Sequence, residues 1–272
     1  MPEGHTIHRL ARDHRPLLVG RAVRTTSPQG RFATGAEMLD GRVVEGIEPY
    51  GKHLFYAFSD DVLLHVHLGL YGSFAVGAGQ PPAPRGALRL RMLVTEPADE
   101  DTSAWIDLRG PTACELFAPA DRDRVVARLG PDPLRKDGDP ARAWARISRS
   151  RTAIGALLMD QSVLAGVGNV YRAEVLYRAG LSPFRPGNEV SEAVWTGMWE
   201  DLRILLRAGV RAGHIVTTAK EDRDRRSGPA RREDRFYVYR RHGLPCRRCG
   251  TEVRTKEMVA RNLFWCPSCQ PA

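Results

Sequence analysis

The spacing of hydrophobic positions changes between the start of the chain and its middle. In residues 5–18, apolar side chains recur at helical spacing and the stretch ends at Gly20, which predicts one N-terminal helix. Residues 21–118 instead carry short runs of β type, separated by Gly, Pro and Asp. The clearest runs lie at 42–50, 52–58, 62–68, 88–94 and 104–108. We expect an antiparallel β-sandwich or barrel after one helix, and of the two we favour the sandwich.

The second half of the chain returns to helical spacing after a proline-rich connection. Residues 129–142 hold three prolines and charges of both signs, which is typical of a domain linker. Two short helices are predicted next, joined by a Gly-rich turn that ends at Asn169, and a third is predicted at about 191–208. Residues 219–235 are too polar to pack, so we expect a flexible basic loop there.

Length and composition favour two domains in a cytoplasmic protein. The chain has 272 residues, which exceeds the usual size of one domain, and 42% of them are hydrophobic, enough for real cores. No apolar run approaches the ~20 residues that a membrane helix needs. Charged residues and histidines are mixed through the first 15 positions, where a signal peptide would be apolar.

Positive charge is concentrated near the C-terminus. The whole chain has a net charge of +9, but residues 203–272 alone hold 17 Lys or Arg against 7 Asp or Glu. Residues 1–202 hold 24 against 25, so their net charge is close to zero. This distribution fits a C-terminal part that grips a phosphate backbone, although a solvated basic face would give the same counts.

The cysteines predict a zinc site. Two C-x2-C pairs, Cys246 with Cys249 and Cys266 with Cys269, are separated by sixteen residues, within the spacing of four-thiolate zinc ribbons. All four tetrahedral positions are filled by thiolate, so one structural Zn²⁺ is expected and no position is left for a reactive water. The intervening residues can form a β-hairpin. The fifth cysteine, Cys114, stands among apolar residues and is interpreted as a small buried side chain.

The start of the chain offers a nucleophile. Pro2 follows Met1, and removal of Met1 would leave a secondary amine at the terminus. An α-amino group has a pKa of ~8 against ~10.4 for lysine, so more of it is neutral at pH 7. Such an amine can attack the anomeric carbon of a sugar and form an iminium. Glu3 is placed for proton transfer. A plain exposed terminus is the alternative that these residues leave open.

Two further features are weaker. The second predicted helix begins at Asn169 after Gly166 and Gly168, and its unpaired backbone N–H groups could bind phosphate, or Asn169 could simply cap the helix. His65 and His67 share one strand face and His53 is near in sequence, so a metal site is conceivable. With no carboxylate at suitable spacing, hydrogen-bonded core histidines are the preferred interpretation.

Taken together, the motifs resemble one known family. The segments that carry the resemblance are PEGHTI at 2–7, GKHL at 51–54, HLGLYG at 67–72, QSVLAGVGNVYRAE at 161–174 and RNLFWCPSCQ at 261–270. They are similar, in order and spacing along the whole chain, to the formamidopyrimidine-DNA glycosylase and endonuclease VIII (Fpg/Nei) enzymes, and look closest to the Nei branch.

The resemblance implies a bifunctional DNA glycosylase and AP lyase that removes oxidised bases, expected to be pyrimidines, by β,δ-elimination. Pro2 would be the nucleophile, Glu3 its acid/base partner, and Lys52 a contact to the phosphate beside the lesion that assists proton transfer. Asn169 and Arg261 would bind neighbouring phosphates. Leu70 and Tyr71 would fill the stack emptied by base eversion, although Leu70 could equally be a core residue.

With the resemblance, the full fold prediction is an α+β protein. Residues 1–128 would form the N-terminal catalytic β-sandwich domain, followed by the linker at 129–142. Residues 143–235 would form a helix-two-turn-helix DNA-binding domain with its flexible basic loop, and 236–272 a zinc-ribbon β-hairpin. The expected partner is damaged DNA, with no membrane association, and we expect a monomer.

This chain departs from the family pattern near the lesion. His5 and Thr6 stand where members often have a second Glu, and Gly69 stands at the usual glutamine of the Nei wedge. Gly110 and Pro111 replace the aromatic wedge that follows Arg109 in the Fpg branch. These changes leave open the lesion range and the preferred opposite base. Two other classes of protein also stay open, a non-catalytic DNA-binding protein and a zinc-ribbon RNA-binding or transcription factor.

Overall fold

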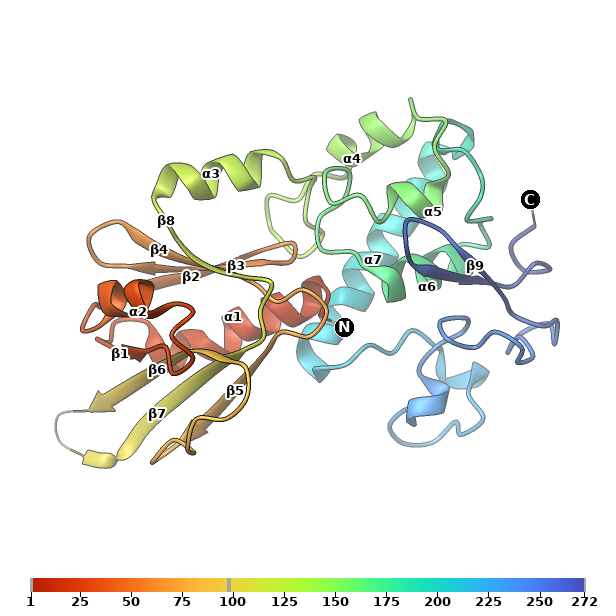
Figure 1. Ribbon diagram of the computed structural model, residues 1–272. Coiled ribbons are helices and arrows are strands. Elements are labelled where there is room, and N and C mark those ends of the chain that lie inside the picture. The colour runs from red at the N-terminus through yellow and green to blue at the C-terminus, as the bar shows by residue number, and fades with distance from the viewer. Residues whose placement is uncertain (1, 97–98, 272) are drawn as a thin grey trace. The chain divides into compact units, whose positions relative to one another are not determined.

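The computed structural model describes residues 2–96 and 99–271, and divides into two compact units (Figure 1). Residues 1–2 and 7–128 form the first unit, and residues 3–6 and 129–272 form the second. Residues 129–142, the expected linker, therefore group with the second unit. The first turn of helix α1 also groups with the second unit, whereas the rest of that helix lies in the first.

Two four-stranded antiparallel sheets make up most of the first unit. One has the strand order β1-β6-β7-β5 and the other β2-β3-β4-β8. The strands are β1 (Arg24–Thr26), β2 (Val44–Tyr50), β3 (His53–Phe58), β4 (Val62–His67), β5 (Ser73–Ala78), β6 (Leu88–Glu96), β7 (Asp99–Arg109) and β8 (Ala113–Phe117). The helices are α1 (Gly4–Leu18), α2 (Ala33–Leu39) and α3 (Pro119–Ala127).

One hydrophobic core joins these two sheets. Leu54 and Val66 come from the β2-β3-β4-β8 sheet, Leu90 and Leu108 come from the β1-β6-β7-β5 sheet, and Ile7 of α1 lies in the same buried cluster. A core shared by the inner faces of two sheets defines a sandwich, so the sandwich prediction is confirmed over the barrel. Cys114 packs against this core as a partly buried side chain.

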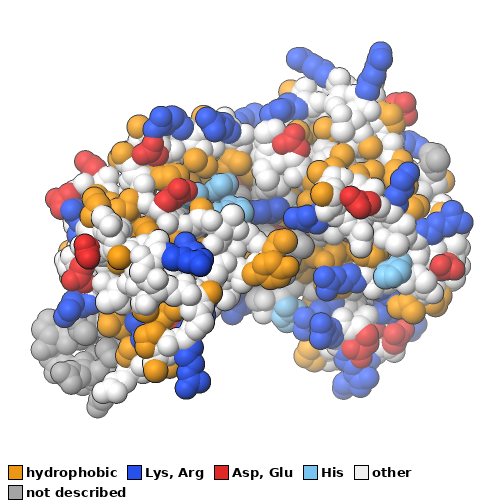
Figure 2. Space-filling view, in the orientation of Figure 1, with side chains coloured by type: hydrophobic (Ala, Val, Ile, Leu, Met, Phe, Trp, Pro, Cys, Tyr) orange, Lys and Arg blue, Asp and Glu red, His pale blue; other side chains and the backbone are white. Residues whose placement is uncertain are grey.

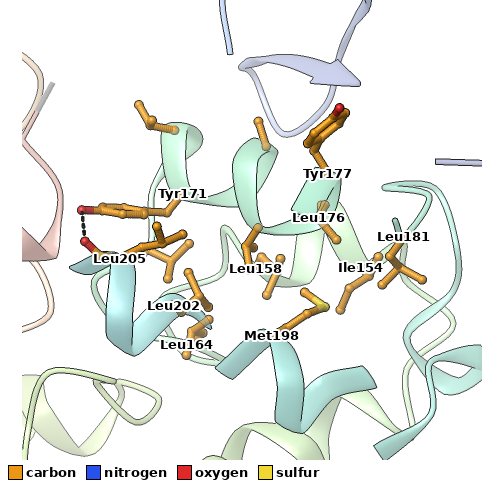
Figure 3. Packing of buried hydrophobic residues seen from close by; sticks show 14 of the residues in the cluster. Ile154, Leu158, Leu164, Tyr171, Leu176, Tyr177, Leu181, Met198, Leu202 and Leu205 are labelled. Carbon is orange, nitrogen blue, oxygen red and sulfur yellow. Dashed lines mark hydrogen bonds between the residues drawn. The ribbon is translucent and has the colours of Figure 1, made fainter. Parts of the chain in front are cut away.

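The second unit is mainly helical. Its regular elements are α4 (Pro140–Ile147), α5 (Ile154–Leu157), α6 (Asn169–Arg178), η1 (Gly187–Glu189), α7 (Glu192–Ala212), η2 (Lys220–Asp222), η3 (Arg232–Asp234), β9 (Arg254–Glu257) and β10 (Asn262–Trp265). Figure 3 shows the apolar core between α5, α6 and α7, to which Leu158, Leu176 and Leu202 contribute. The hairpin of β9 and β10 packs against α6 through β10 (Figure 1).

The first helix of the predicted pair is short. Helix α5 ends at Leu157, and Gln161 lies in the turn that follows. The Gln161 amide donates to the carbonyl groups of Met159 and Val167, and its oxygen accepts the Gly166 N–H. The glutamine therefore braces the Gly-rich turn from inside and fixes where α6 begins.

The Arg-rich segment 219–235 is tied to the rest of the second unit at both ends. The buried carboxylate of Glu174, on α6, accepts the Thr217 hydroxyl and the backbone N–H groups of Tyr237, Val238 and Tyr239. The last three distances are 2.8–2.9 Å. One carboxylate thus joins the two ends of the segment. Burial raises the pKa of Glu174, whereas these hydrogen bonds favour its charged form.

Candidate DNA-repair site

The four paired cysteines form a metal site. Their Sγ atoms all lie within 4.8 Å of one another. Cys246 and Cys269 are 3.8 Å apart and Cys249 and Cys266 are 3.5 Å apart, sulfur to sulfur. A tetrahedral Zn²⁺ with Zn–S bonds of ~2.3 Å requires sulfur–sulfur distances of about 3.8 Å. The donor set and its geometry therefore fit one structural zinc ion. In the described part of the chain this is the one His, Cys, Asp or Glu cluster with such geometry.

Glu3 is buried at the N-terminal end of helix α6. Its carboxylate accepts the Gly168 N–H and the Val170 N–H, both at 2.9 Å, and the Tyr171 N–H at 3.5 Å. The Glu3 side chain is fully buried. The partial positive charge of a helix N-terminus and these N–H donors both favour the carboxylate form. The structure thus places a buried anion one residue after Pro2.

These contacts correct the expectation for the start of α6. The N–H groups of Gly168 and Val170 were expected to be unpaired and open to phosphate, but they already donate to Glu3. The N-cap residue is Gly168, so the capping role considered for Asn169 is also wrong. Residue spacing alone does not reveal that a side chain 165 positions earlier in the chain reaches this helix.

Close backbone approach explains the glycines around Glu3. The Gly4 N–H donates to the Gly166 carbonyl at 2.8 Å, and a Cβ on Gly4 would lie 3.0 Å from Gly166 Cα. A Cβ on Gly168 would lie 2.5 Å from Glu3 Cδ. The spaced glycines of the 165–168 turn therefore make room for the start of the chain.

Asn169 binds the zinc hairpin at the residue that follows Arg261. The Asn169 side-chain amide donates to the Asn262 carbonyl at 2.9 Å, directly after Arg261 in the chain. Arg261 closes the β9–β10 turn by backbone hydrogen bonds with Met258 and is partly exposed. The structure therefore brings together three of the predicted site residues, Glu3, Asn169 and Arg261, within the second unit.

Lys52 lies in the first unit, in the tight turn between β2 and β3. Its neighbour Gly51 has φ +56°, and Tyr50 pairs with His53 across the turn. The Lys52 charge acts on His53 and His67, whose pKa values it helps to lower. Pro2, also in the first unit, is partly buried just before α1.

Two of the three histidines, His53 and His65, form a hydrogen-bonded chain that ends at Glu115, and the His67 ring lies beside His53. His53 Nδ1 is 2.9 Å from His65 Nε2, and His65 Nδ1 is 3.0 Å from Glu115 Oε1. Because the His65 nitrogens are engaged on both sides, the ligand atoms do not converge on one point, which agrees with the preferred non-metal interpretation. No carboxylate lies at suitable spacing in the sequence, but the pairing of β4 with β8 brings Glu115 opposite His65. Burial is the main cause that lowers the pKa of His53 to about 3.

Leu70 and Tyr71 project from the turn between β4 and β5. Tyr71 is 88% exposed and Leu70 is 40% exposed, so Leu70 is not a core residue. Gly69 has φ +65°, and a Cβ there would lie 1.9 Å from the Thr112 hydroxyl oxygen. A glutamine at position 69 would therefore not fit this turn, and the loop presents one aliphatic and one aromatic side chain to solvent.

Basic side chains are scattered over the visible face of the second unit (Figure 2), where residues 203–272 carry an excess of Lys and Arg. Some of this charge is neutralised locally. Arg247 and Arg248 pair with Asp224 and Asp222 of the Arg-rich segment, and Arg247 also pairs with Asp234. Across the described residues, no helix is long and apolar enough to span a bilayer.

Family models match nearly the whole chain. The formamidopyrimidine-DNA glycosylase N-terminal domain matches residues 1–114, and the formamidopyrimidine-DNA glycosylase H2TH domain matches residues 129–221. The zinc finger found in FPG and IleRS matches residues 243–272.

Curated proteins and solved structures agree with these matches. The chain is 48% identical to endonuclease 8 1 of Mycobacterium tuberculosis, over 99% of this chain and all of that protein. It is 34% identical to formamidopyrimidine-DNA glycosylase of Acidothermus cellulolyticus, over 100% and 96% of the two chains. The fold matches MutM bound to DNA containing carbocyclic 8-oxo-G (TM-score 0.81, 22% identity, full coverage of both chains). It also matches MutM (Fpg) of Thermus thermophilus (TM-score 0.76, 29% identity, 99% and 98% coverage).

Proposed function

Because the chain belongs to the formamidopyrimidine-DNA glycosylase and endonuclease VIII family of DNA-repair glycosylases, we propose that it excises oxidised pyrimidines from DNA and then cuts the strand. The observation that carries this proposal is the Glu3 carboxylate, buried on the N–H groups of α6 and covalently next to Pro2. A non-catalytic DNA-binding protein needs no buried acid at this position. Repair of oxidised bases is supported by the likeness to endonuclease 8 1, and the narrower choice of pyrimidines is proposed from the resemblance to the Nei branch.

The chemistry requires removal of Met1, which leaves Pro2 as a secondary amine. The Pro2 nitrogen attacks C1′ of the damaged nucleotide, and the base leaves with the electrons of its glycosidic bond. The Glu3 carboxylate takes the proton from the new ammonium and passes it to the ring oxygen as the sugar opens. The resulting iminium between Pro2 and C1′ acidifies the C2′ protons.

Strand cleavage follows from that acidity. Loss of a C2′ proton expels the 3′ phosphate by β-elimination, and a second elimination expels the 5′ phosphate. Water then hydrolyses the iminium and frees Pro2. The product is a one-nucleotide gap with phosphate on both sides. The zinc ion held by the four cysteines supplies no step, because its coordination by thiolates leaves no open position.

DNA binding is proposed to involve five further side chains. Lys52 contacts the phosphate beside the lesion, and Asn169 and Arg261 contact neighbouring phosphates from adjacent positions on α6 and the hairpin. Leu70 and Tyr71 fill the space left by the everted nucleotide, because an apolar or aromatic side chain can replace base stacking. We further expect the protein to act as a cytoplasmic monomer.

The decisive experiment is borohydride trapping on a duplex that contains thymine glycol or an abasic site. Protein with a processed N-terminus should form a covalent adduct, and protein with one extra residue before Pro2 should form none. Glu3→Gln should lose base excision and keep its affinity for DNA. If the extended protein forms the adduct at the native rate, Pro2 is not the nucleophile and Lys52 becomes the first candidate.

A further inference from the structure

Arg172 is a charged residue buried in the second unit, and no step above uses it. It lies on α6, one helical turn after Asn169, and its side chain is fully buried. Burying a guanidinium group costs free energy unless hydrogen bonds compensate for the water that its donors lose. Burial lowers the pKa of Arg172 to about 10, with Glu3 acting in the opposite direction, so the group remains charged at neutral pH.

The partners of Arg172 are the residues around the phosphate-contacting pair. Its Nη2 group donates to Asn169 Oδ1, and its Nη1 group donates to the carbonyl oxygens of Met258 and Gly155, both at 3.3 Å. The contacts close a ring. Asn169 Nδ2 donates to the Asn262 carbonyl at 2.9 Å, and Met258 is joined to Arg261 by two backbone hydrogen bonds.

This ring fixes the orientation of the Asn169 amide. A guanidinium donor on Oδ1 means that the amide cannot flip, because a flip would bring its NH2 group against the Arg172 NH2 group. One N–H of Asn169 is used on Asn262 and the second points elsewhere. An amide held in this way presents a donor, and not an acceptor, to an anion.

The same guanidinium also holds the tip of the hairpin. Val259 and Ala260, between Met258 and Arg261, have φ +55° and +51°. Positive φ is unusual for any residue with a side chain and rare for a β-branched one, so this turn is strained and needs support from outside. The Arg172 bond to the Met258 carbonyl is such support, at the residue where the turn begins.

We propose that Arg172 is a positioning residue for DNA binding, which locks the Asn169 amide and the 258–261 turn together so that Asn169 and Arg261 reach neighbouring phosphates as one unit. The inference rests on the proposed function, because it assumes that these two residues contact DNA. It adds a residue that touches neither the lesion nor the backbone of the DNA.

The test uses Arg172→Met, which keeps length and helix propensity but removes the donors. Arg178→Met is the matched control, since Arg178 lies on the same helix and pairs with Asp201 and the Thr217 carbonyl, away from the hairpin tip. Affinity is measured on a duplex with a tetrahydrofuran abasic-site analogue at several KCl concentrations, and zinc content is measured on each protein. We expect Arg172→Met to weaken binding about tenfold with zinc retained, and Arg178→Met to bind as the unmodified protein does.

A double-mutant cycle separates positioning from a general structural effect. In an Asn169→Ala/Arg261→Ala background, Arg172→Met should change the affinity by less than about twofold, because its targets are gone. Undiminished tenfold weakening in that background would overturn the proposal, and so would native affinity of Arg172→Met alone. If unmodified protein shows no preference for the abasic analogue, the proposed function fails instead.

A second variant covers the case in which Arg172→Met does not fold. Arg172→Lys keeps the charge, but one ammonium group cannot span Asn169 and Met258 as the forked guanidinium does. We expect Arg172→Lys to retain zinc and to bind several-fold more weakly than the unmodified protein, with a shallower salt dependence as Arg261 loses its place. Native affinity and native salt dependence in Arg172→Lys would refute the positioning role.

Discussion

A Cβ atom on Gly168 would lie 2.5 Å from Cδ of Glu3, although the two residues are 165 positions apart in the chain. The carboxylate of Glu3 and the backbone of Gly168 are in direct contact, so there is no room for a side chain at position 168. The relationship explains why the turn before α6 must be glycine-rich and gives a way to displace Glu3 without changing its chemistry.

Gly168→Ala is expected to abolish base excision. The new methyl group must push the Glu3 carboxylate off the N–H groups of Gly168 and Val170, since the Gly168 backbone is fixed by the start of α6. Excision is measured on a duplex containing thymine glycol. Gly197→Ala on α7 is the control, because nothing lies within 4 Å of a Cβ there. The control should keep full activity and gain about 0.5–1 kcal/mol in stability. Normal excision by Gly168→Ala would show that Glu3 does not need this contact.

Zinc removal should loosen the Arg-rich segment 219–235 as well as the hairpin. Arg247 and Arg248 are the two residues between Cys246 and Cys249, and they pair with Asp222, Asp224 and Asp234. Loss of the metal frees the knuckle that holds both arginines in place. Limited trypsin digestion should therefore cut the chelated protein within 219–235 well before the zinc-bound protein.

The control for that digestion is Cys114→Ser, in the first unit, which should retain one zinc ion and the native digestion pattern. A Cys249→Ser variant should behave like the chelated protein. Purified protein without zinc by elemental analysis, or identical digestion with and without chelator, would contradict the prediction.

The histidine chain predicts a loss of stability in mild acid. Burial, with help from His67, His65 and Lys52, lowers the pKa of His53 to about 3, against ~6.5 in an unfolded chain. The unfolded state therefore binds a proton more readily below pH 6.5. The free energy of unfolding falls as the pH drops from about 6.5 toward 3, and His53 alone contributes about 2 kcal/mol of this loss at pH 5.

His53→Gln tests this origin, because glutamine can keep a hydrogen bond to His65 but does not titrate. Urea unfolding at pH 7 and pH 5 should show a smaller difference in this variant than in the unmodified protein. Equal differences in the two proteins would place the acid sensitivity elsewhere, with buried His14 as the next candidate, since burial lowers its pKa to about 4.

The strained turn of the zinc hairpin can be relieved. Val259→Asn together with Ala260→Gly places the preferred residues at two positions with positive φ. The thermal unfolding midpoint should rise, with a gain of about 1 kcal/mol or more. Affinity for abasic-site DNA should not fall, because Arg261 and the Met258 carbonyl stay in place. A lower midpoint would show that Val259 and Ala260 contribute packing that outweighs their backbone strain.

Local patterns in the sequence were enough for the zinc site and most of the regular structure. The two C-x2-C pairs define their own geometry, and β2, β3 and β4 follow the predicted runs within two residues. Strand β5 was missed because Ser73–Ala78 is half-exposed and contains Gly77, so it shows little alternation. Strand β8 was missed for a similar reason, since the residues of Ala113–Phe117 are partly buried or exposed and do not alternate between buried and exposed.

Contacts between distant segments could not be predicted from spacing. Glu115 contacts His65 only through the register of β4 and β8. Glu3 contacts Val170 only when folding brings the start of the chain to helix α6. Arg172 lies within the family-like segment 161–174, but nothing in the sequence distinguishes a buried arginine on α6 from an exposed one. The roles of Pro2, Lys52, Leu70 and Tyr71 stay predictions that the experiments above address.

The burial of Glu3 against α6 also sets an order in time for synthesis of the chain. Residue 3 leaves the ribosome early, but the N–H groups that receive its carboxylate belong to Gly168 and Val170. At about 5–20 residues per second, roughly 10–30 seconds pass before Val170 is made. During that interval the N–H groups that bind the Glu3 carboxylate do not yet exist. The removal of Met1 that we propose can therefore take place on an open N-terminus, before folding buries Glu3.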